Sequence, residues 1–237
     1  MFTQRIKRRL LRTLESTLLF FAPERKRLPI RFWIHKLSGG CEEEIRHLHR
    51  IISDRGTAID IGANTGLYTY VMARHFSKVI AFEINDGLTR ELAVWNPGNI
   101  TIIAKGLSSC DGDAVLHIPV VNGNTLTGWA SLDPHNCPDA QYCIEKPVTL
   151  TRLDSFELPS VSFIKIDVEG HELEVLKGAA STLARSRPIC LVEVKAQNQA
   201  EVVSFMTAQN YEMKTLAELI GVSGSQENRF FIPCLRS

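Results

Sequence analysis

The sequence predicts an α/β protein of the Rossmann-like type, with a mostly parallel sheet covered by helices on both faces. Short apolar runs rich in β-branched residues alternate with segments of helical periodicity along most of the chain. One such run, residues 58–61, passes through a turn containing Gly62 and Gly66 into a helix predicted over 67–75. A strand, a glycine-containing turn and a helix in this order form the corner that binds the ligand in such sheets.

The remaining elements follow from the same two periodicities. Strands are predicted over 58–61, 79–83, 100–103, 114–118, 161–168, 189–194, 211–215 and 229–232, and helices over 41–52, 67–75, 86–95, 172–183 and 198–208. The segment 119–146 is rich in Pro, Gly, Asn and Asp, which predicts a long loop. Such a loop is either a lid that faces the substrate or an excursion without function.

Length and composition favour one α/β domain with a short appendage. The chain has 237 residues, of which 44% are hydrophobic, so it can bury a full core. Its net charge of +1 gives no nucleic-acid signature. The six cysteines form no Cys-x-x-Cys pair, and without a recognisable export signal we expect reduced thiols and a cytoplasmic location.

The N-terminal part differs from the rest in charge. Residues 1–36 hold ten Lys/Arg and two Glu, a net charge of +8. We therefore expect a basic helical appendage over 1–50 and the main domain over 51–237. Residues 1–22 predict an amphipathic helix, with two interpretations: peripheral contact with an anionic membrane at its inner face, or packing on the domain or a partner subunit.

The spacing of the glycines indicates which ligand the corner takes. A dinucleotide site uses Gly-x-Gly-x-x-Gly, but here Asn64 occupies the middle position of Gly62-Ala-Asn-Thr-Gly66. Asp60, just before the loop, would repel a pyrophosphate. Glu83 ends the next strand about 20 residues on, where an acid binds ribose hydroxyls. S-adenosylmethionine, which has a ribose and cationic groups but no phosphate, fits these residues best.

Acidic residues recur at the predicted carboxyl ends of the strands. In a parallel sheet these ends meet at one edge, where ligands bind, so the acids predict a single active site. They are Asp60, Glu83, Asp167, Glu169 and Glu193.

The segment Ile166-Asp-Val-Glu-Gly-His171 predicts the chemical site. Alternation in an extended chain would place Asp167 and Glu169 on the same side. His171, at the start of the next helix, is the candidate base for a hydroxyl proton, or else a capping residue. Clustered with His171, the two carboxylates could deprotonate a hydroxyl nucleophile, coordinate a divalent metal, or cap the helix and hold the loop, and Lys165 could pair with one of them.

Several of these motifs, in this order, resemble the FkbM family of S-adenosylmethionine-dependent methyltransferases. They are Asp60-Ile-Gly-Ala-Asn-Thr-Gly-Leu-Tyr-Thr69, Ala81-Phe-Glu83, Phe163-Ile-Lys-Ile-Asp-Val-Glu-Gly-His-Glu172, Val175-Leu-Lys-Gly-Ala179 and Leu191-Val-Glu-Val194. The resemblance covers about residues 55–232 and implies a seven-stranded class I methyltransferase sheet. It also implies O-methylation of a hydroxyl on a sugar or polyketide-type metabolite.

The resemblance assigns site residues as well. It implies a cofactor loop of Gly62, Asn64 and Gly66, with Glu83 on the ribose. Leu107-Ser108 matches the family's Ala-Leu-Ser segment near the adenine, with Gly106 in place of alanine.

The acceptor is therefore expected to be a small molecule or glycan, and not nucleic acid. Two alternatives remain open from the sequence. The first is an NAD(P)-dependent oxidoreductase on a similar sheet, and the second is a non-catalytic accessory protein that keeps the fold.

Overall fold

The computed structural model describes residues 17–137 and 139–234. Most of the helix expected within residues 1–22 lies outside the described residues. Its last part, residues 17–21, is helical and leads into α2 (Glu24–Ser38). Within the described ranges, no helix has the length and apolar character needed to cross a bilayer.

The main sheet is Rossmann-like, as the sequence predicts, and has seven strands in the order β10-β11-β9-β8-β1-β2-β3. The pairs from β9 to β3 are parallel, and β11 runs antiparallel to both neighbours. The strands are β1 (Thr57–Ile61), β2 (Lys78–Phe82), β3 (Ile100–Ile103), β8 (Val161–Ile166), β9 (Ile189–Glu193), β10 (Tyr211–Lys214) and β11 (Asn228–Pro233). All strands predicted for this sheet are present, within a few residues of their expected ends.

Helices cover both faces of this sheet because successive strand residues point to opposite sides. Ile59, Ile61 and Ile164 belong to a buried cluster with apolar residues of α6 (Glu172–Lys177), α7 (Ala180–Ser186) and α8 (Gln199–Ala208). Ala58 and Phe163 face the other side. They cluster with residues of α2, α3 (Glu43–Ile51), α4 (Leu67–Met72), α5 (Arg90–Trp95) and α9 (Leu216–Ile220).

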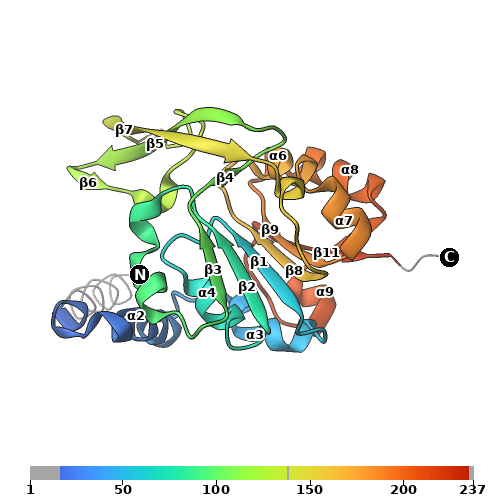
Figure 1. Ribbon diagram of the computed structural model, residues 1–237, viewed down its shortest axis with the longest axis horizontal. Helices are drawn as coiled ribbons and strands as arrows, with labels where there is room; N and C mark the ends of the chain where they lie inside the picture. Colours follow the sequence, from blue (N-terminus) through green and yellow to red (C-terminus); the bar gives the residue numbers. More distant parts are fainter. Residues whose placement is uncertain (1–16, 138, 235–237) are drawn as a thin grey trace.

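The expectation of a long loop over 119–146 is correct for its middle part and wrong for its ends. The described residues between 126 and 141 lie in no named strand, and several of them line the pocket described below, whereas residues 119–121, 124–125 and 142–146 belong to strands. The structure forms a second, four-stranded sheet in the order β4-β7-β5-β6, which lies across one end of the main sheet (Figure 1). Its strands are β4 (Gly106–Leu107), β5 (Gly112–Val121), β6 (Asn124–Thr125) and β7 (Tyr142–Thr151). β5 and β7 pair from Gly112 with Leu150 to Val120 with Tyr142, so both ends of the expected loop belong to this two-stranded ribbon.

The helix expected over 172–183 is divided into α6 and α7 at Gly178 and Ala179. A Cβ atom at position 178 would lie 1.9 Å from the carbonyl oxygen of Ser108. The chain after β4 therefore passes directly against Gly178. This contact joins the second sheet to helices α6 and α7 next to the site described below.

Residues 24–51 pack onto the same core as the later helices. Leu28 and Phe32 of α2, and Ile45 and Leu48 of α3, are buried in the cluster on that face of the main sheet. The Arg31 guanidinium pairs with Glu91 of α5 at 3.1 Å, which fixes α2 to the domain.

Candidate active site

The corner between β1 and α4 has the predicted two-glycine form. Gly62 and Gly66 have φ angles of 78° and 88°, in the left-handed region that favours glycine. A Cβ atom on Gly62 would lie 1.8 Å from the carbonyl oxygen of Asp167. Glycine at 62 is therefore required for the ends of β1 and β8 to approach one another.

Glu83 follows β2 and is held on both of its oxygens by backbone N–H groups. Asn64 donates to one carboxylate oxygen at 2.6 Å and Asn85 donates to the other at 2.7 Å. Burial raises the pKa of Glu83, and these two bonds counteract part of that rise. A carboxylate has about four acceptor positions, so this fixed group retains capacity for ligand hydroxyls.

A pocket, called here the main pocket, opens between the carboxyl ends of β1, β2 and β8 and the second sheet. It is open to solvent at its mouth. Six of the predicted site residues line it: Gly62, Asn64, Glu83, Asp167, Glu169 and His171. Its apolar wall includes Phe82, Ile84, Leu107 and Leu150.

Three further predicted site residues have other surroundings. Asp60, Gly66 and Ser108 are not among the residues that line the main pocket. The buried Asp60 carboxylate accepts a hydrogen bond of 2.5 Å from the Thr69 hydroxyl. Burial raises the pKa of Asp60 to about 6. Gly66 packs beneath the corner, against Leu92.

The segment from Asp167 to His171 is a turn, so the expected alternation of Asp167 and Glu169 does not occur. β8 ends at Ile166, and Glu169 and Gly170 have φ angles of 53° and 104°. A glutamate in the left-handed region is strained, and such strain concentrates at functional sites. Both carboxylates nevertheless reach the main pocket.

The strained turn is held from three directions. Glu172, a buried residue that the sequence analysis did not select, accepts the Gly170 N–H at 2.7 Å. Ser131, from the segment between β6 and β7, donates its hydroxyl to the Glu169 carbonyl at 2.9 Å. Lys195, after β9, pairs with the Glu169 carboxylate at 3.1 Å. The bonds from Ser131 and Lys195 depend on tertiary contacts, so no sequence pattern indicated them, whereas the bond to Glu172 is local, two residues along the chain.

His171 is the N-cap residue of α6, as expected, and its ring lines the main pocket. Its Nε2 atom lies 2.9 Å from the hydroxyl oxygen of Ser108. Burial lowers the pKa of His171, and nearby Glu174 offsets part of that effect. The imidazole is therefore neutral near pH 7 and able to accept a proton.

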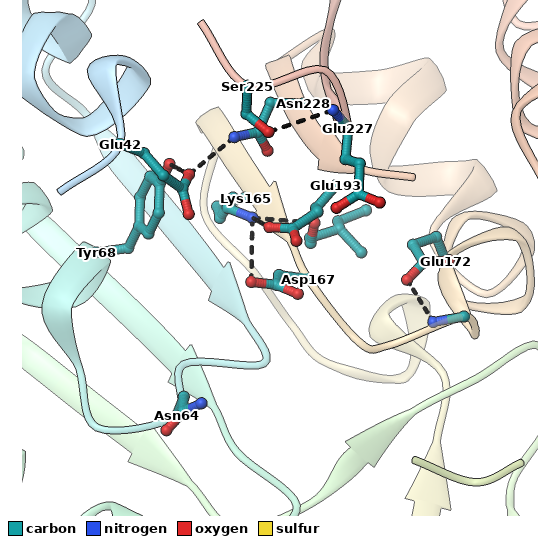
Figure 2. A network of polar contacts seen from close by, with 12 residues as sticks. Glu42, Asn64, Tyr68, Lys165, Asp167, Glu172, Glu193, Ser225, Glu227 and Asn228 are labelled. Atoms are coloured by element: carbon teal, nitrogen blue, oxygen red, sulfur yellow. Dashed lines mark hydrogen bonds and ion pairs between the residues drawn. The ribbon is translucent and has the colours of Figure 1, made fainter. Parts of the chain in front are cut away.

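Lys165 lies at the centre of a buried ionic network on the α4 side of the sheet (Figure 2). Its ammonium is 3.5 Å from the Asp167 carboxylate and 3.6 Å from that of Glu193, so the expected pairing is confirmed. Burial alone would lower the pKa of Lys165, but attraction to these acids outweighs it and raises the pKa. Burial and the negative charge of Asp167 raise the pKa of Glu193 to about 8.

A side pocket opens on this network, on the far side of the glycine corner. Gly62, Asn64 and Asp167 line both pockets. Lys165 also lies under the Tyr68 ring, 4.9 Å from its centroid, and the Tyr68 hydroxyl donates to Glu42 at 2.5 Å. Among the described residues, no group of three or more His, Cys, Asp and Glu side chains is arranged to hold a metal ion.

The fold and this corner define a class of protein, the Rossmann-like methyltransferases, and the sequence comparison gives the family. Residues 60–213 match the Methyltransferase FkbM domain family, and the chain belongs to it. It is 31% identical over 162 residues to the hexuronic acid methyltransferase AglP of Haloferax volcanii. That alignment covers 66% of this chain and 63% of AglP, so the chain matches slightly less than two thirds of that relative.

Solved structures with a similar fold include two other methyltransferases. The methyltransferase FkbM of Methylobacillus flagellatus is 14% identical, with a TM-score of 0.48, over 92% of this chain and 57% of that one. A putative methyltransferase of Streptococcus mutans in complex with SAH is 12% identical, with a TM-score of 0.48, over 80% of this chain and 94% of that one.

Proposed function

We propose that this protein transfers a methyl group from S-adenosylmethionine to a hydroxyl group of a sugar. Membership of the FkbM family and the likeness to a hexuronic acid methyltransferase support the reaction and the acceptor class. The main structural support for the choice of cofactor is the Glu83 carboxylate. Two backbone N–H groups fix it at the edge of the main pocket. The same family membership counts against the oxidoreductase alternative, as does Asn64 at the middle glycine position.

The residues of the corner fit this cofactor. Glu83 has acceptor positions left for the two hydroxyls of a ribose, and the apolar wall that includes Phe82 and Leu107 suits an adenine ring. Glu42, Asp60 and Asp167 line the side pocket beside the one cation of Lys165, which favours the ammonium group of the cofactor there.

The chain's own residues supply positioning and a base. S-adenosylmethionine, when bound, supplies an electrophilic methyl group, so catalysis requires an acceptor oxygen held in line and a group that takes its proton. We propose that Nδ1 of His171 takes the proton of the acceptor hydroxyl. Nε2–H then donates to the Ser108 oxygen, which orients the ring and leaves Nδ1 free to accept.

The roles of Asp167 and Glu169 follow from their partners. Lys165 keeps Asp167 in place at the boundary of the two pockets, and Lys195 does the same for Glu169 near His171. We propose that they hold the acceptor's hydroxyls rather than abstract the proton, because each is already paired with a lysine. For Ser108, which the family resemblance places near the adenine, we propose instead that it positions His171.

Two measurements test the function. Isothermal titration of the purified chain with S-adenosylmethionine should give a single site, and Glu83→Ala should lower the affinity about tenfold or more, because a charge-assisted hydrogen bond is lost. The exposed Glu157→Ala is the matched control. A wild-type chain that does not bind the donor would overturn the proposal.

The acceptor is tested with a labelled methyl donor. We expect label to enter glycans that contain hexuronic acids, with neutral glycans and RNA as comparisons. Transfer into RNA alone would contradict the acceptor class while leaving the cofactor assignment intact.

A further inference from the structure

The helix α2 has a second apolar stripe that faces away from the domain. Leu28 and Phe32 are buried against the core, whereas Trp33 is 48% exposed and Leu37 is 76% exposed. Ile30, Trp33 and Leu37 lie at helical spacing on one face. A helix that needed only to cover the core would carry a polar outer face here.

The stripe continues into residues 17–23, which precede α2. Phe20 and Phe21 are 77% and 79% exposed. Leu18, Phe21, Pro23, Ile30, Trp33 and Leu37 line one wide, open and almost entirely apolar groove. Five of the nine exposed large apolar residues of the described chain fall between positions 18 and 37. Exposed apolar groups gathered in this way mark an interaction surface.

The same end of the molecule carries the positive charge. Residues 1–36 have a net charge of +8, while the whole chain has +1, so residues 37–237 have a net charge of −7. Lys26 is exposed and lines the groove, and the Lys36 ammonium lies 4.9 Å from the centre of the Trp33 ring. The groove therefore combines aromatic and aliphatic side chains with a basic border.

We propose that this surface, residues 18–37, docks on the interface of an anionic lipid bilayer. Aromatic and leucine side chains enter the boundary between headgroups and acyl chains, while lysines and arginines pair with acidic headgroups. The charge asymmetry selects this occupant over a second copy of the chain, because two such surfaces would bring like charges together. The proposal does not depend on the methyl-transfer reaction.

The test is sedimentation of the full chain with vesicles. We expect binding to phosphatidylcholine vesicles that contain phosphatidylserine, little binding to phosphatidylcholine alone, and weaker binding at high salt. The double variant Trp33→Ser/Leu37→Ser should bind about tenfold or more weakly, since each buried apolar group contributes to the affinity. Tyr142→Ser/Ile144→Ser, at exposed apolar sites on β7, is the matched control and should bind like the wild type.

Three results would overturn the docking proposal. Absence of wild-type binding to the anionic vesicles, or equal binding by the wild type and the Trp33/Leu37 variant, would overturn the proposal. So would light scattering that shows a wild-type dimer which the variant abolishes, with no lipid binding by either. Circular dichroism of both double variants checks that they are folded, so this result stays separate from the cofactor proposal.

Discussion

At the residue scale, three groups of the site have pKa values displaced mainly by burial. The pKa values of Asp60 and Glu83 are raised, and the pKa of His171 is lowered. Burial disfavours the charged form of each group, so the protein must compensate with fixed hydrogen-bond partners. Thr69, the Asn64 N–H and Ser108 are such partners.

Replacement of His171 tests its role as the base. We expect His171→Ala to lower kcat about 100-fold or more with cofactor affinity nearly unchanged. In the wild type, kcat/KM should rise with pH as the imidazole loses its proton, with a midpoint below about 6.5 because burial lowers the pKa of His171.

Ser108 provides the accompanying test of positioning. Ser108→Ala should reduce kcat less than His171→Ala and move the midpoint of the pH profile, because the ring loses its partner. The control is Ser162→Ala, because the Ser162 hydroxyl contacts Asp54 and not His171. An unchanged pH profile in Ser108→Ala would remove the positioning role.

The ionisation of Asp60 should lower the free energy of unfolding as the pH rises. Its pKa is raised from 3.8 to about 6, so the folded protein holds this proton more tightly than the unfolded chain. Its stabilising contribution is complete below about pH 4 and is lost through pH 6, a change of up to about 3 kcal/mol. Asp60→Asn, which still accepts from Thr69, should remove this dependence.

Urea unfolding at pH 4 and pH 7 measures the effect. The stability of Asp60→Asn relative to wild type should be greater at pH 7 than at pH 4. The exposed Asp113→Asn on β5 is the control. The same relative stability at both pH values would contradict the assignment.

At the scale of elements, the second sheet and the break between α6 and α7 complete the pocket. Five pocket residues, Thr127, Gly128, Ala130, Ser131 and Leu132, come from the connection between β6 and β7. Ser131 also holds the strained turn at Glu169. The second sheet is therefore a wall of the site and a support for its chemical residues.

Gly178 joins this sheet to the helices. Gly178→Ala would place Cβ 1.9 Å from the Ser108 carbonyl oxygen, so α6 must shift relative to β4. We expect a loss of about 2–3 kcal/mol in unfolding free energy, typical of overpacking, together with reduced activity through His171. Urea denaturation measures the first effect.

Gly112→Ala on β5 is the matched control, because a Cβ there meets nothing within 4 Å. It should leave stability unchanged or raise it by up to about 1 kcal/mol. Equal losses in the two variants would show that the contact at Gly178 is unimportant.

At the scale of the whole molecule, the main pocket lies where the two sheets meet. The residues that line it come from both sheets, so a ligand there contacts elements of both and its binding should stabilise the complete fold. We expect S-adenosylmethionine at 100 times its Kd to add about 2.7 kcal/mol to the unfolding free energy. Thermal unfolding measures this, with NAD as the comparison, and stabilisation by NAD alone would favour an oxidoreductase.

The sequence by itself determined the main sheet and the corner of the site. β1, Gly62, Gly66 and α4 occur as predicted because a buried apolar run, two glycines and a helix start are local signals. The positions of Glu83 and His171 beside the pocket were predicted in the same way, since Glu83 directly follows a strand and His171 precedes a helix. Local signals can place a residue at the carboxyl edge of a sheet without any tertiary information.

Only the tertiary structure decided which side chains meet. The pairing of β5 with β7 needs a partner strand, and amphipathic β sequence with polar residues on its exposed face resembles a loop when read alone. The contact of Ser108 with His171 joins positions 63 residues apart, and that of Glu169 with Lys195 joins two different strand ends. Such contacts depend on how strands and helices stack, and no short stretch of sequence contains that information.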